Sequence, residues 1–306
     1  MTQQPESTAR FAARGIVASD PLEDLPIGAS LSIEPIVYGS SDSTVQPQAV
    51  KNWGFFDGAI LGLGLKSRTG LDITGTAVMI APGLAVTAGH ILRESLTQLR
   101  AGDRIPYCLG VRDNGRLDVW RTTAVSYDDG DIAFLSLELN SPTDEGWRLR
   151  CVPVTTRTPA VGETLTICGF RLPEVSSGDL VRFIGEMLAS RGVVQAFYED
   201  GRDTVLVWYP AIEILCGSRG GMSGGAVFDS SGHLVGVIST GMELESGDGP
   251  TYAAWIVPGL FRDVTIPWPA GLYPKPVRVA NAHLHLEGGQ HLSHTEDCGS
   301  YRQWSE

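Results

Sequence analysis

Short apolar runs separated by turn residues make up most of the chain from Ser30 onward. The runs are rich in Val, Ile, Leu and Thr, and Gly, Pro, Asn and Asp interrupt them every few residues. Such a pattern is typical of short strands joined by tight turns, whereas long amphipathic helical patterns are scarce. The pattern therefore predicts an all-β fold, either a barrel or a sandwich.

Three turns predict β-hairpins, because each has turn chemistry in the middle and an apolar run on both sides. Asp113-Asn114-Gly115 separates Tyr107–Val111 from Leu117–Ala124, Glu199-Asp200-Gly201 separates Val193–Tyr198 from Thr204–Tyr209, and Asp229-Ser230-Ser231-Gly232 separates Ala226–Phe228 from Leu234–Ser239.

Changes in the pattern divide the chain into four parts. The first residues mix Gln, Pro, Glu, Ser and Asp without periodicity, which is typical of a flexible arm. The segment Val152–Gly162 contains two prolines and interrupts the strands, so it is the best candidate for a connection between two β units. After Trp268 the chain is rich in proline and then polar. We therefore expect an arm over residues 1–26, a first β-barrel over 27–152, a second over 153–268 and a peripheral tail over 269–306.

Composition and charge narrow the choice of partners. Hydrophobic residues make up 42% of the chain, as a packed core requires, and 35 Asp and Glu against 23 Lys and Arg give a net charge of −12. Such a surface would repel phosphate backbones and anionic lipid headgroups. The start of the chain lacks the apolar stretch of a secretory signal, and no apolar run approaches the length of a membrane span. We expect a cytoplasmic protein that binds neither nucleic acid nor membrane.

Cysteine and histidine usage predicts neither disulfides nor a metal ion. The chain has five cysteines, an odd number, and no C-x-x-C pair; they are Cys108, Cys151, Cys168, Cys216 and Cys298. Isolated thiols of this kind are usually small buried apolar side chains. Four histidines gather near Cys298 in the polar tail, namely His283, His285, His291 and His294. A transition metal could bind there, but histidines in such a tail are usually solvated, and we expect neither a metal nor an organic cofactor.

Two segments offer a base and a carboxylate. Thr87-Ala88-Gly89-His90 follows two apolar runs joined by a turn, which places His90 at the end of a hairpin strand. Asp128-Asp129-Gly130-Asp131 leads into the apolar run Ile132–Leu135, and Asp131 is the carboxylate next to buried positions. Taken singly, the first segment also fits an ordinary histidine at a strand end, and the second fits a turn whose aspartates are solvated, as we expect for Asp128 and Asp129.

A third segment, Gly220–Gly225, embeds Ser223 in glycines just before an apolar run. Glycine allows backbone conformations in which amide N–H groups point at a common spot. The N–H groups of Gly221 and Ser223 could therefore form an oxyanion hole, which stabilises an oxygen that becomes negative during attack on a carbonyl. Taken alone, the segment also fits a flexible glycine-rich loop.

Proton transfer explains why these residue types belong together. A serine hydroxyl is too weakly acidic to attack an amide at neutral pH, so it needs a base whose pKa lies near the operating pH. A histidine supplies this base, and a buried aspartate holds the histidine in the correct tautomer and stabilises its charged form. We therefore expect Ser223 to be the nucleophile, His90 the general base and Asp131 the residue that orients His90.

In this order the segments resemble the trypsin-like, chymotrypsin-fold peptidases, which carry Thr-Ala-x-His, an Asp-Ile-Ala-Leu-like segment and Gly-x-Ser-Gly-Gly. The corresponding residues here are Thr87–His90, Asp131–Leu135 and Gly221–Gly225, and the resemblance covers roughly residues 54 to 260. It implies two six-stranded antiparallel β-barrels with the active site between them. It also implies an endopeptidase that cleaves extended protein or peptide substrates through an acyl-enzyme intermediate.

The resemblance further implies where a substrate binds. Leu234–Gly241 looks like the strand that pairs with an extended substrate, with Ser239, Thr240 and Gly241 at the specificity pocket. Gly217 and Ser218 stand at the base of that pocket, where trypsin has an aspartate. Without an acid there, a small or apolar substrate side chain is expected, although Glu243, Glu245 and Asp248 could place negative charge at the rim.

Two departures from the family pattern concern stability and control. Ile91 stands where secreted members have a disulfide-bonded cysteine, which agrees with a reducing compartment. Met222 stands where many members have an aspartate that pairs with the amino terminus freed by zymogen cleavage. We expect another restraint on activity. One candidate is the glycine-rich loop Gly217–Gly225, whose composition gives it little intrinsic reason to hold one conformation. The others are the arm and a regulatory protein partner.

Two alternatives stay open. Gly-x-Ser-x-Gly also fits the nucleophile elbow of α/β-hydrolases, in which the chain order is serine, acid and histidine; Asp263 and His283 could complete that order. The elbow needs a helix directly after the serine, however, and Ala226–Phe228 predicts a strand. The other alternative is a peptidase fold that has lost turnover and presents a groove to a partner protein.

Overall fold

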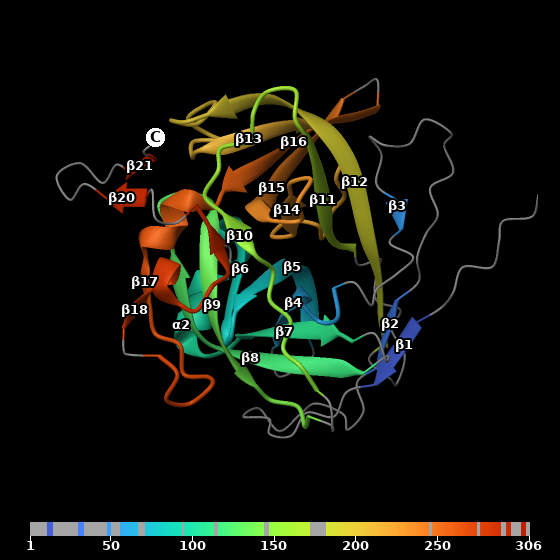
Figure 1. Cartoon of the computed structure of the whole chain (residues 1–306). Helices are drawn as coiled ribbons and strands as arrows, with labels where there is room; N and C mark the ends of the chain where they lie inside the picture. Colours follow the sequence, from blue (N-terminus) through green and yellow to red (C-terminus); the bar gives the residue numbers. More distant parts are fainter. Residues whose placement is uncertain are drawn as a thin grey trace, which may run out of the picture.

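The computed structural model describes residues 11–14, 30–33, 48–49, 56–66, 71–93, 95–112, 116–143, 147–171, 182–244, 247–273, 276–288, 292–294 and 301–303. Strands dominate these residues and form two barrels, the first in cyan and green and the second in yellow and orange (Figure 1). Within this part of the chain, no helix is both long enough and apolar enough to cross a membrane.

The first barrel is closed by six antiparallel strands in the order β4-β5-β6-β9-β8-β7. The strands are β4 (Ile60–Lys66), β5 (Leu71–Ala81), β6 (Leu84–Ala88), β7 (Ile105–Val111), β8 (Leu117–Tyr127) and β9 (Ile132–Leu139). Alternate side chains such as Leu61, Leu63 and Leu65 form one core cluster. Their neighbours on the opposite face, such as Ile60 and Val78, belong to a second cluster that extends into the other barrel. Both faces of these strands are therefore buried, which explains their near-continuous apolar sequence.

The second barrel is also a closed ring of six antiparallel strands, in the order β12-β11-β14-β15-β16-β13. The strands are β11 (Thr164–Arg171), β12 (Arg182–Tyr198), β13 (Ala211–Leu215), β14 (Ala226–Phe228), β15 (Leu234–Leu244) and β16 (Gly247–Trp255). Strands β11 and β15 contact β5 and β6 of the first barrel. The predicted all-β fold of two six-stranded barrels is confirmed.

Two of the three predicted hairpins are confirmed, those joining β7 to β8 and β14 to β15. The third is wrong, because β12 pairs with β13, and Thr204–Tyr209 forms a loop. Asp203 explains the loop: its Oδ1 accepts hydrogen bonds from the backbone N–H groups of Val205 and Leu206, at 2.8 and 2.6 Å. A carboxylate that binds its own backbone in this way stabilises a tight turn in place of a ladder.

Short elements complete the described part of the chain. The helices are α1 (Gly89–Arg93), α2 (Leu96–Ala101), η2 (Val257–Phe261) and η3 (Val279–Asn281). The short strands are β1 (Phe11–Arg14), β2 (Ser30–Ile33), β3 (Gln48–Ala49), β10 (Val154–Thr155), β17 (Asp263–Val264), β18 (Val277–Arg278), β19 (Leu286–Glu287), β20 (Leu292–His294) and β21 (Tyr301–Gln303). Of the predicted arm, β1 is described and pairs with β2, while residues 1–10 and 15–26 lie outside the described residues.

The predicted peripheral tail differs from the structure over residues 276–288. Val279 and Ala282 are completely buried, and β19 pairs with β10 in the connection between the barrels. Just before this segment, the hydroxyl of Tyr273 donates a hydrogen bond to the backbone carbonyl of Pro82 at 2.7 Å. Apolar residues at short intervals attach this stretch to the barrels, although its polar composition suggested otherwise. His291 and Cys298 lie outside the described residues.

Candidate active site

A cleft of about 380 Å³ lies beside the segments that the sequence singles out. The first barrel contributes His90 and Asp131 to its walls, and the second contributes Ser223, Ser239 and Thr240. Residues that are far apart in the sequence therefore meet in one place.

Strand pairing brings His90 and Asp131 together. Strands β6 and β9 are neighbours, with Ala88 opposite Ile132, so the residue pair beyond this position lies at the same end of the barrel. There the chain turns from β6 into the single helical turn α1, which carries His90. The backbone N–H of Gly89 donates to the carbonyl of Asp131 at 3.1 Å, which holds the two segments in register.

The side chains of His90 and Asp131 make a short hydrogen bond. Nδ1 of His90 lies 2.7 Å from Oδ2 of Asp131, and the backbone N–H of His90 donates to Oδ1 at 2.7 Å. Asp131 is 1% exposed, whereas the His90 side chain is 38% exposed. Because an ionised carboxylate only accepts hydrogen bonds, Nδ1 carries the imidazole proton, and Nε2 has a free lone pair as a general base requires.

Ser239 extends this network into the second barrel. Its hydroxyl donates to Oδ2 of Asp131 at 2.6 Å, and it also hydrogen-bonds the hydroxyl of Tyr209. Burial raises the pKa of Tyr209, so the phenol keeps its proton. The buried Asp131 carboxylate therefore has several donors, as a desolvated charge requires. The sequence predicts Ser239 only at the substrate pocket, and its contact with Asp131 and the role of Tyr209 were missed.

The hydroxyl of Ser223 donates to the backbone carbonyl of Ser239 at 3.2 Å. Among the hydrogen bonds of the described residues, none joins Ser223 to His90. Rotation about the Cα–Cβ bond of Ser223 is the smallest change that would redirect its hydroxyl. Catalytic hydrogen bonds are often poorly aligned before a substrate binds.

The glycine-rich loop is fastened to the first barrel by Thr76 of β5, which is fully buried. The backbone N–H of Thr76 donates to the carbonyl of Ser223 at 2.8 Å, and its hydroxyl donates to the carbonyl of Gly221 at 2.9 Å. Gly221 and Gly224 have positive φ angles of 91° and 80°, which glycine adopts without strain. Hydrogen bonds from Thr76 therefore hold the loop in one conformation, whereas its glycine-rich composition predicts little intrinsic conformational preference. The role of Thr76 was not predictable from the motif.

The same bonds leave two amide groups available. The backbone carbonyls of Gly221 and Ser223 both accept hydrogen bonds from Thr76. No hydrogen bond among the described residues uses the backbone N–H of Gly221 or Ser223. These are the two amides that the sequence predicts for the oxyanion hole.

The turn before Asp131 is held by both barrels. Asp128 is nearly buried and accepts a hydrogen bond from Nε of Arg262 at 3.0 Å, so the expectation that it is solvated is wrong. The side chain of Asp129 is fully exposed, as expected for a turn residue. From the first barrel, Arg93 donates to the carbonyl of Gly130 at 2.8 Å, and from the β12–β13 loop, Nε1 of Trp208 donates to the carbonyl of Asp129 at 3.4 Å.

The predicted substrate residues divide into two groups. Ser218, Ser239, Thr240 and Gly241 line the cleft, whereas Gly217 is not among its described walls, and its carbonyl accepts a hydrogen bond from Ser190 at 2.7 Å. The side chains of Glu243, Glu245 and Asp248 lie outside the described residues.

The β12–β13 loop adds an apolar wall to the cleft that the sequence did not predict. Val205, Leu206 and Trp208 line it and are 74%, 55% and 43% exposed. Because this segment resembles a strand in composition, its position over the cleft was not predictable from periodicity.

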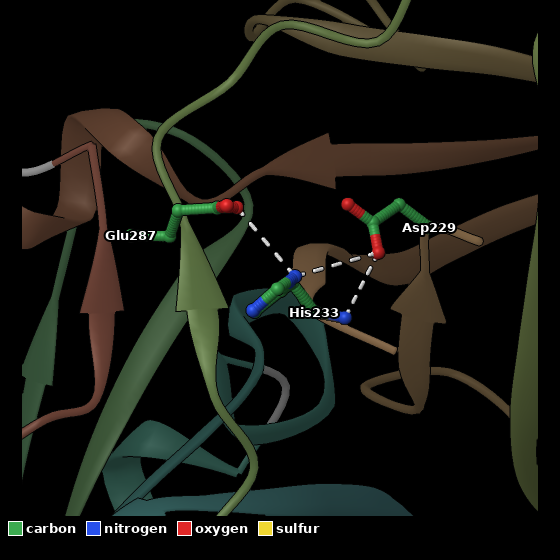
Figure 2. A group of neighbouring side chains, drawn as sticks. All are labelled: Asp229, His233 and Glu287. Atoms are coloured by element: carbon green, nitrogen blue, oxygen red, sulfur yellow. Dashed lines mark hydrogen bonds and ion pairs between the residues drawn. The ribbon is translucent and has the colours of Figure 1, made fainter. Parts of the chain in front are cut away.

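A separate group of side chains could hold a metal ion. Asp229, His233 and Glu287 bring one ligand atom each to within 4.8 Å of one another in the described part of the chain (Figure 2). They lie at the end of the β14–β15 hairpin that is opposite to the Ser223 loop.

Comparisons with known proteins find similar solved structures and a matching family. Among solved structures, Deg5 is 21% identical over 66% of this chain and 85% of its own, with a TM-score of 0.45. The inactive form of Rv3671c from M. tuberculosis H37Rv is 16% identical over 64% of this chain and 80% of its own, with a TM-score of 0.40. These two likenesses concern the fold alone, and no curated protein matches the chain.

A family model described as a trypsin-like peptidase domain matches residues 75–237. This range is more than half of the chain and includes His90, Asp131 and Ser223. The chain therefore belongs to the trypsin-like peptidase family.

Proposed function

We propose that the protein is a serine endopeptidase, with Ser223 as nucleophile, His90 as general base and Asp131 as the residue that orients His90. The observation that carries this proposal is the 2.7 Å hydrogen bond between His90 Nδ1 and the buried Asp131, in the same cleft as Ser223. This bond prepares Nε2 of His90 to accept a proton.

The chemistry follows from these positions. The Ser223 hydroxyl turns from the Ser239 carbonyl toward His90, gives its proton to Nε2 and attacks the substrate carbonyl carbon. The tetrahedral intermediate collapses, the C–N bond breaks, and His90 gives the proton to the leaving amine. Water then attacks the acyl-enzyme with His90 again as base, which releases the carboxylic acid and restores Ser223.

The N–H groups of Gly221 and Ser223 are the proposed oxyanion hole. Their availability supports this role, since the neighbouring carbonyls are bonded to Thr76 while these amides have no acceptor in the described structure. Preorganised donors of this kind stabilise the developing negative charge without reorganisation during the reaction.

We propose protein or peptide substrates in an extended conformation, bound along β15. Ser218, Thr240 and Gly241 lie at the cleft, and Val205, Leu206 and Trp208 form its apolar wall. A small or apolar side chain at the scissile bond fits these surroundings better than a charged one.

A cytoplasmic location is also a proposal. It is supported by three cysteines of the described residues, Cys108, Cys151 and Cys168, which are free thiols. Activity should then be the same with and without dithiothreitol. Loss of activity in dithiothreitol would contradict a disulfide-free enzyme.

Labelling with a fluorophosphonate probe tests the proposal against the alternative of a silent binding module. One observation favours the alternative, because the Ser223 hydroxyl is bonded to Ser239 and not to His90. An activated serine should label, and Ser223→Ala should abolish the label and lower turnover by on the order of 10⁵-fold or more. A folded protein that neither labels nor cleaves any peptide in a mixed library would favour the binding module.

A further inference from the structure

Three side chains from two distant segments meet at the far end of the β14–β15 hairpin. Asp229 and His233 belong to the turn between these strands, and Glu287 belongs to β19 in the segment after the second barrel (Figure 2). The group is separate from the cleft that contains Ser223, and the proposed reaction does not use it.

The distances fit a shared cation better than direct hydrogen bonds. Nδ1 of His233 lies 3.7 Å from Oδ1 of Asp229 and 3.5 Å from Oε2 of Glu287. Hydrogen bonds to nitrogen are usually no longer than about 3.2 Å. Two ligands of one zinc ion, each about 2.0–2.1 Å from it in a tetrahedral arrangement, are separated by roughly 3.3–3.5 Å.

Nδ1 of His233 is a buried atom without a hydrogen-bond partner. In Figure 2 this nitrogen points toward both carboxylates. As a neutral acceptor it would present a lone pair to two anions, and as a donor it is too far from either for a normal hydrogen bond. A cation between the three atoms would give the nitrogen a partner and would neutralise charge on both carboxylates.

The local charge also favours a cation. One pocket is lined by three carboxylates and one guanidinium, which leaves two negative charges in excess; these groups are Asp229, Glu287, Glu163 and Arg157. Arg157 binds Glu163 at 2.6 Å and Oδ2 of Asp229 at 3.1 Å, so it does not occupy the oxygen that faces His233.

Backbone groups orient the Asp229 ligand. The N–H groups of Ser231 and His233 each donate to its Oδ1 at 2.9 Å. Hydrogen bonds of this kind hold metal-binding carboxylates in place. The ring of His233 is stacked on that of His285, with an interplanar angle of 7°, which further limits its orientation.

We propose that Asp229, His233 and Glu287 bind a divalent transition-metal ion of the zinc class, with water completing its coordination. One imidazole nitrogen with two carboxylates suits such an ion better than calcium or magnesium, which prefer oxygen ligands throughout. The side chain of Glu287 is 55% exposed, so the affinity is moderate. The ion joins the segment after the second barrel to the hairpin whose other end carries Ser223.

Titration of chelator-treated full-length protein with zinc, followed by calorimetry, tests this site. One equivalent should bind the unmodified protein and raise its thermal unfolding temperature. Glu287→Gln should weaken zinc binding by about tenfold or more, because it keeps the side-chain shape but removes the charge. His233→Gln should remove the one-equivalent binding.

The matched control is His283→Asn, a change of another histidine, in the segment that carries Glu287. Asn tolerates the positive φ of 52° at this position, so the variant should fold and bind zinc as the unmodified protein does. If His233→Gln fails to fold, Glu287→Gln decides the question, since its exposed side chain supports no core packing.

Cobalt provides a second readout. Bound Co²⁺ should show visible d–d bands of an ion with nitrogen and oxygen ligands, without the intense near-ultraviolet band of a thiolate ligand. Absence of zinc binding by the unmodified protein would overturn the proposal. So would unchanged binding by both ligand variants, or a thiolate band, since either would locate the metal elsewhere in the chain.

Discussion

Ser239 contacts two members of the proposed catalytic group. Its hydroxyl donates to Asp131, while its backbone carbonyl accepts the hydroxyl of Ser223. The identities of His90, Asp131 and Ser223 were predictable because each lies in a short segment with a distinctive composition. The contacts of Ser239, Tyr209 and Thr76 were not, because they are ordinary polar residues whose partners lie on distant strands.

Replacing Asp131 by Asn should lower kcat by on the order of 10⁴-fold, because an amide nitrogen cannot accept the Nδ1 proton and His90 would adopt the wrong tautomer. Steady-state kinetics on an apolar peptide measures this loss. Asp129→Asn is the matched control, since Asp129 is fully exposed on the same turn and should retain nearly full activity. Equal loss in both variants would show that Asp131 is not the residue that orients His90.

At the scale of elements, the turn residues determined which of the three predicted hairpins formed. The turns after Val111 and Phe228 join strands that pair with each other, as their glycine-containing sequences predict. The segment 204–209 has the composition of a strand, but the side chain of Asp203 binds its backbone, and a long loop results. Strand composition cannot reveal such a competition, because the deciding hydrogen bonds come from one side chain.

Gly224→Ala tests whether the loop conformation supports the nucleophile. Gly224 has a φ of 80°, and an added Cβ would collide with the backbone carbonyl of Thr76. We expect a loss of stability on the order of 3 kcal/mol and a nearly inactive enzyme, because Ser223 must move with its neighbour. Urea unfolding and kcat measure the two effects.

Gly232→Ala is the control for this change. Its φ is 83°, but no atom lies within 4 Å of an added Cβ. It should cost only about 1–2 kcal/mol of backbone strain and leave kcat intact. An active Gly224→Ala enzyme would show that the loop tolerates displacement.

The connection between the barrels should contribute stability that depends on pH. Two hydrogen bonds from Arg157 to Glu163 lower the pKa of that carboxyl in the folded chain. Since the unfolded value is about 4.3, this contribution is complete above that pH and is lost as the pH falls through the lower folded pKa. Urea unfolding at about pH 7 and about pH 3 should show a smaller acid loss in Glu163→Gln than in the unmodified protein. Equal losses would mean that the pair contributes nothing.

At the scale of the whole molecule, the two-barrel fold was predictable because the alternation of runs and turns is regular and the family segments occur in order. The position of residues 276–288 was not predictable, since burial of Val279 and Ala282 depends on surfaces that exist only after both barrels form. The boundaries between arm, barrels and tail stay predictions.

Arg262 connects the end of the second barrel to the turn of the first that precedes Asp131. Arg262→Gln should lower the free energy of unfolding by about 1–2 kcal/mol, because Asp128 is nearly buried and would lose its ion-pair partner. It should also lower kcat, since the turn positions Asp131. Arg278→Gln is the control, as Arg278 and its partner Asp263 are both about half exposed, and its effect should be at most about 0.5 kcal/mol. A stable and fully active Arg262→Gln enzyme would show that the ion pair does not position Asp131.

His90 and Asp131 belong to the first barrel and Ser223 to the second, and this separation along the chain has a consequence for synthesis on the ribosome. The serine is added 92 residues after Asp131, which corresponds to on the order of ten seconds of translation. During that interval the nascent chain has a base but no nucleophile, and Thr76 has no loop to hold. If the chain is the endopeptidase we propose, a growing chain therefore cannot cut its neighbours on the same polysome, and the proposed hydrolysis requires the second barrel to have emerged and docked.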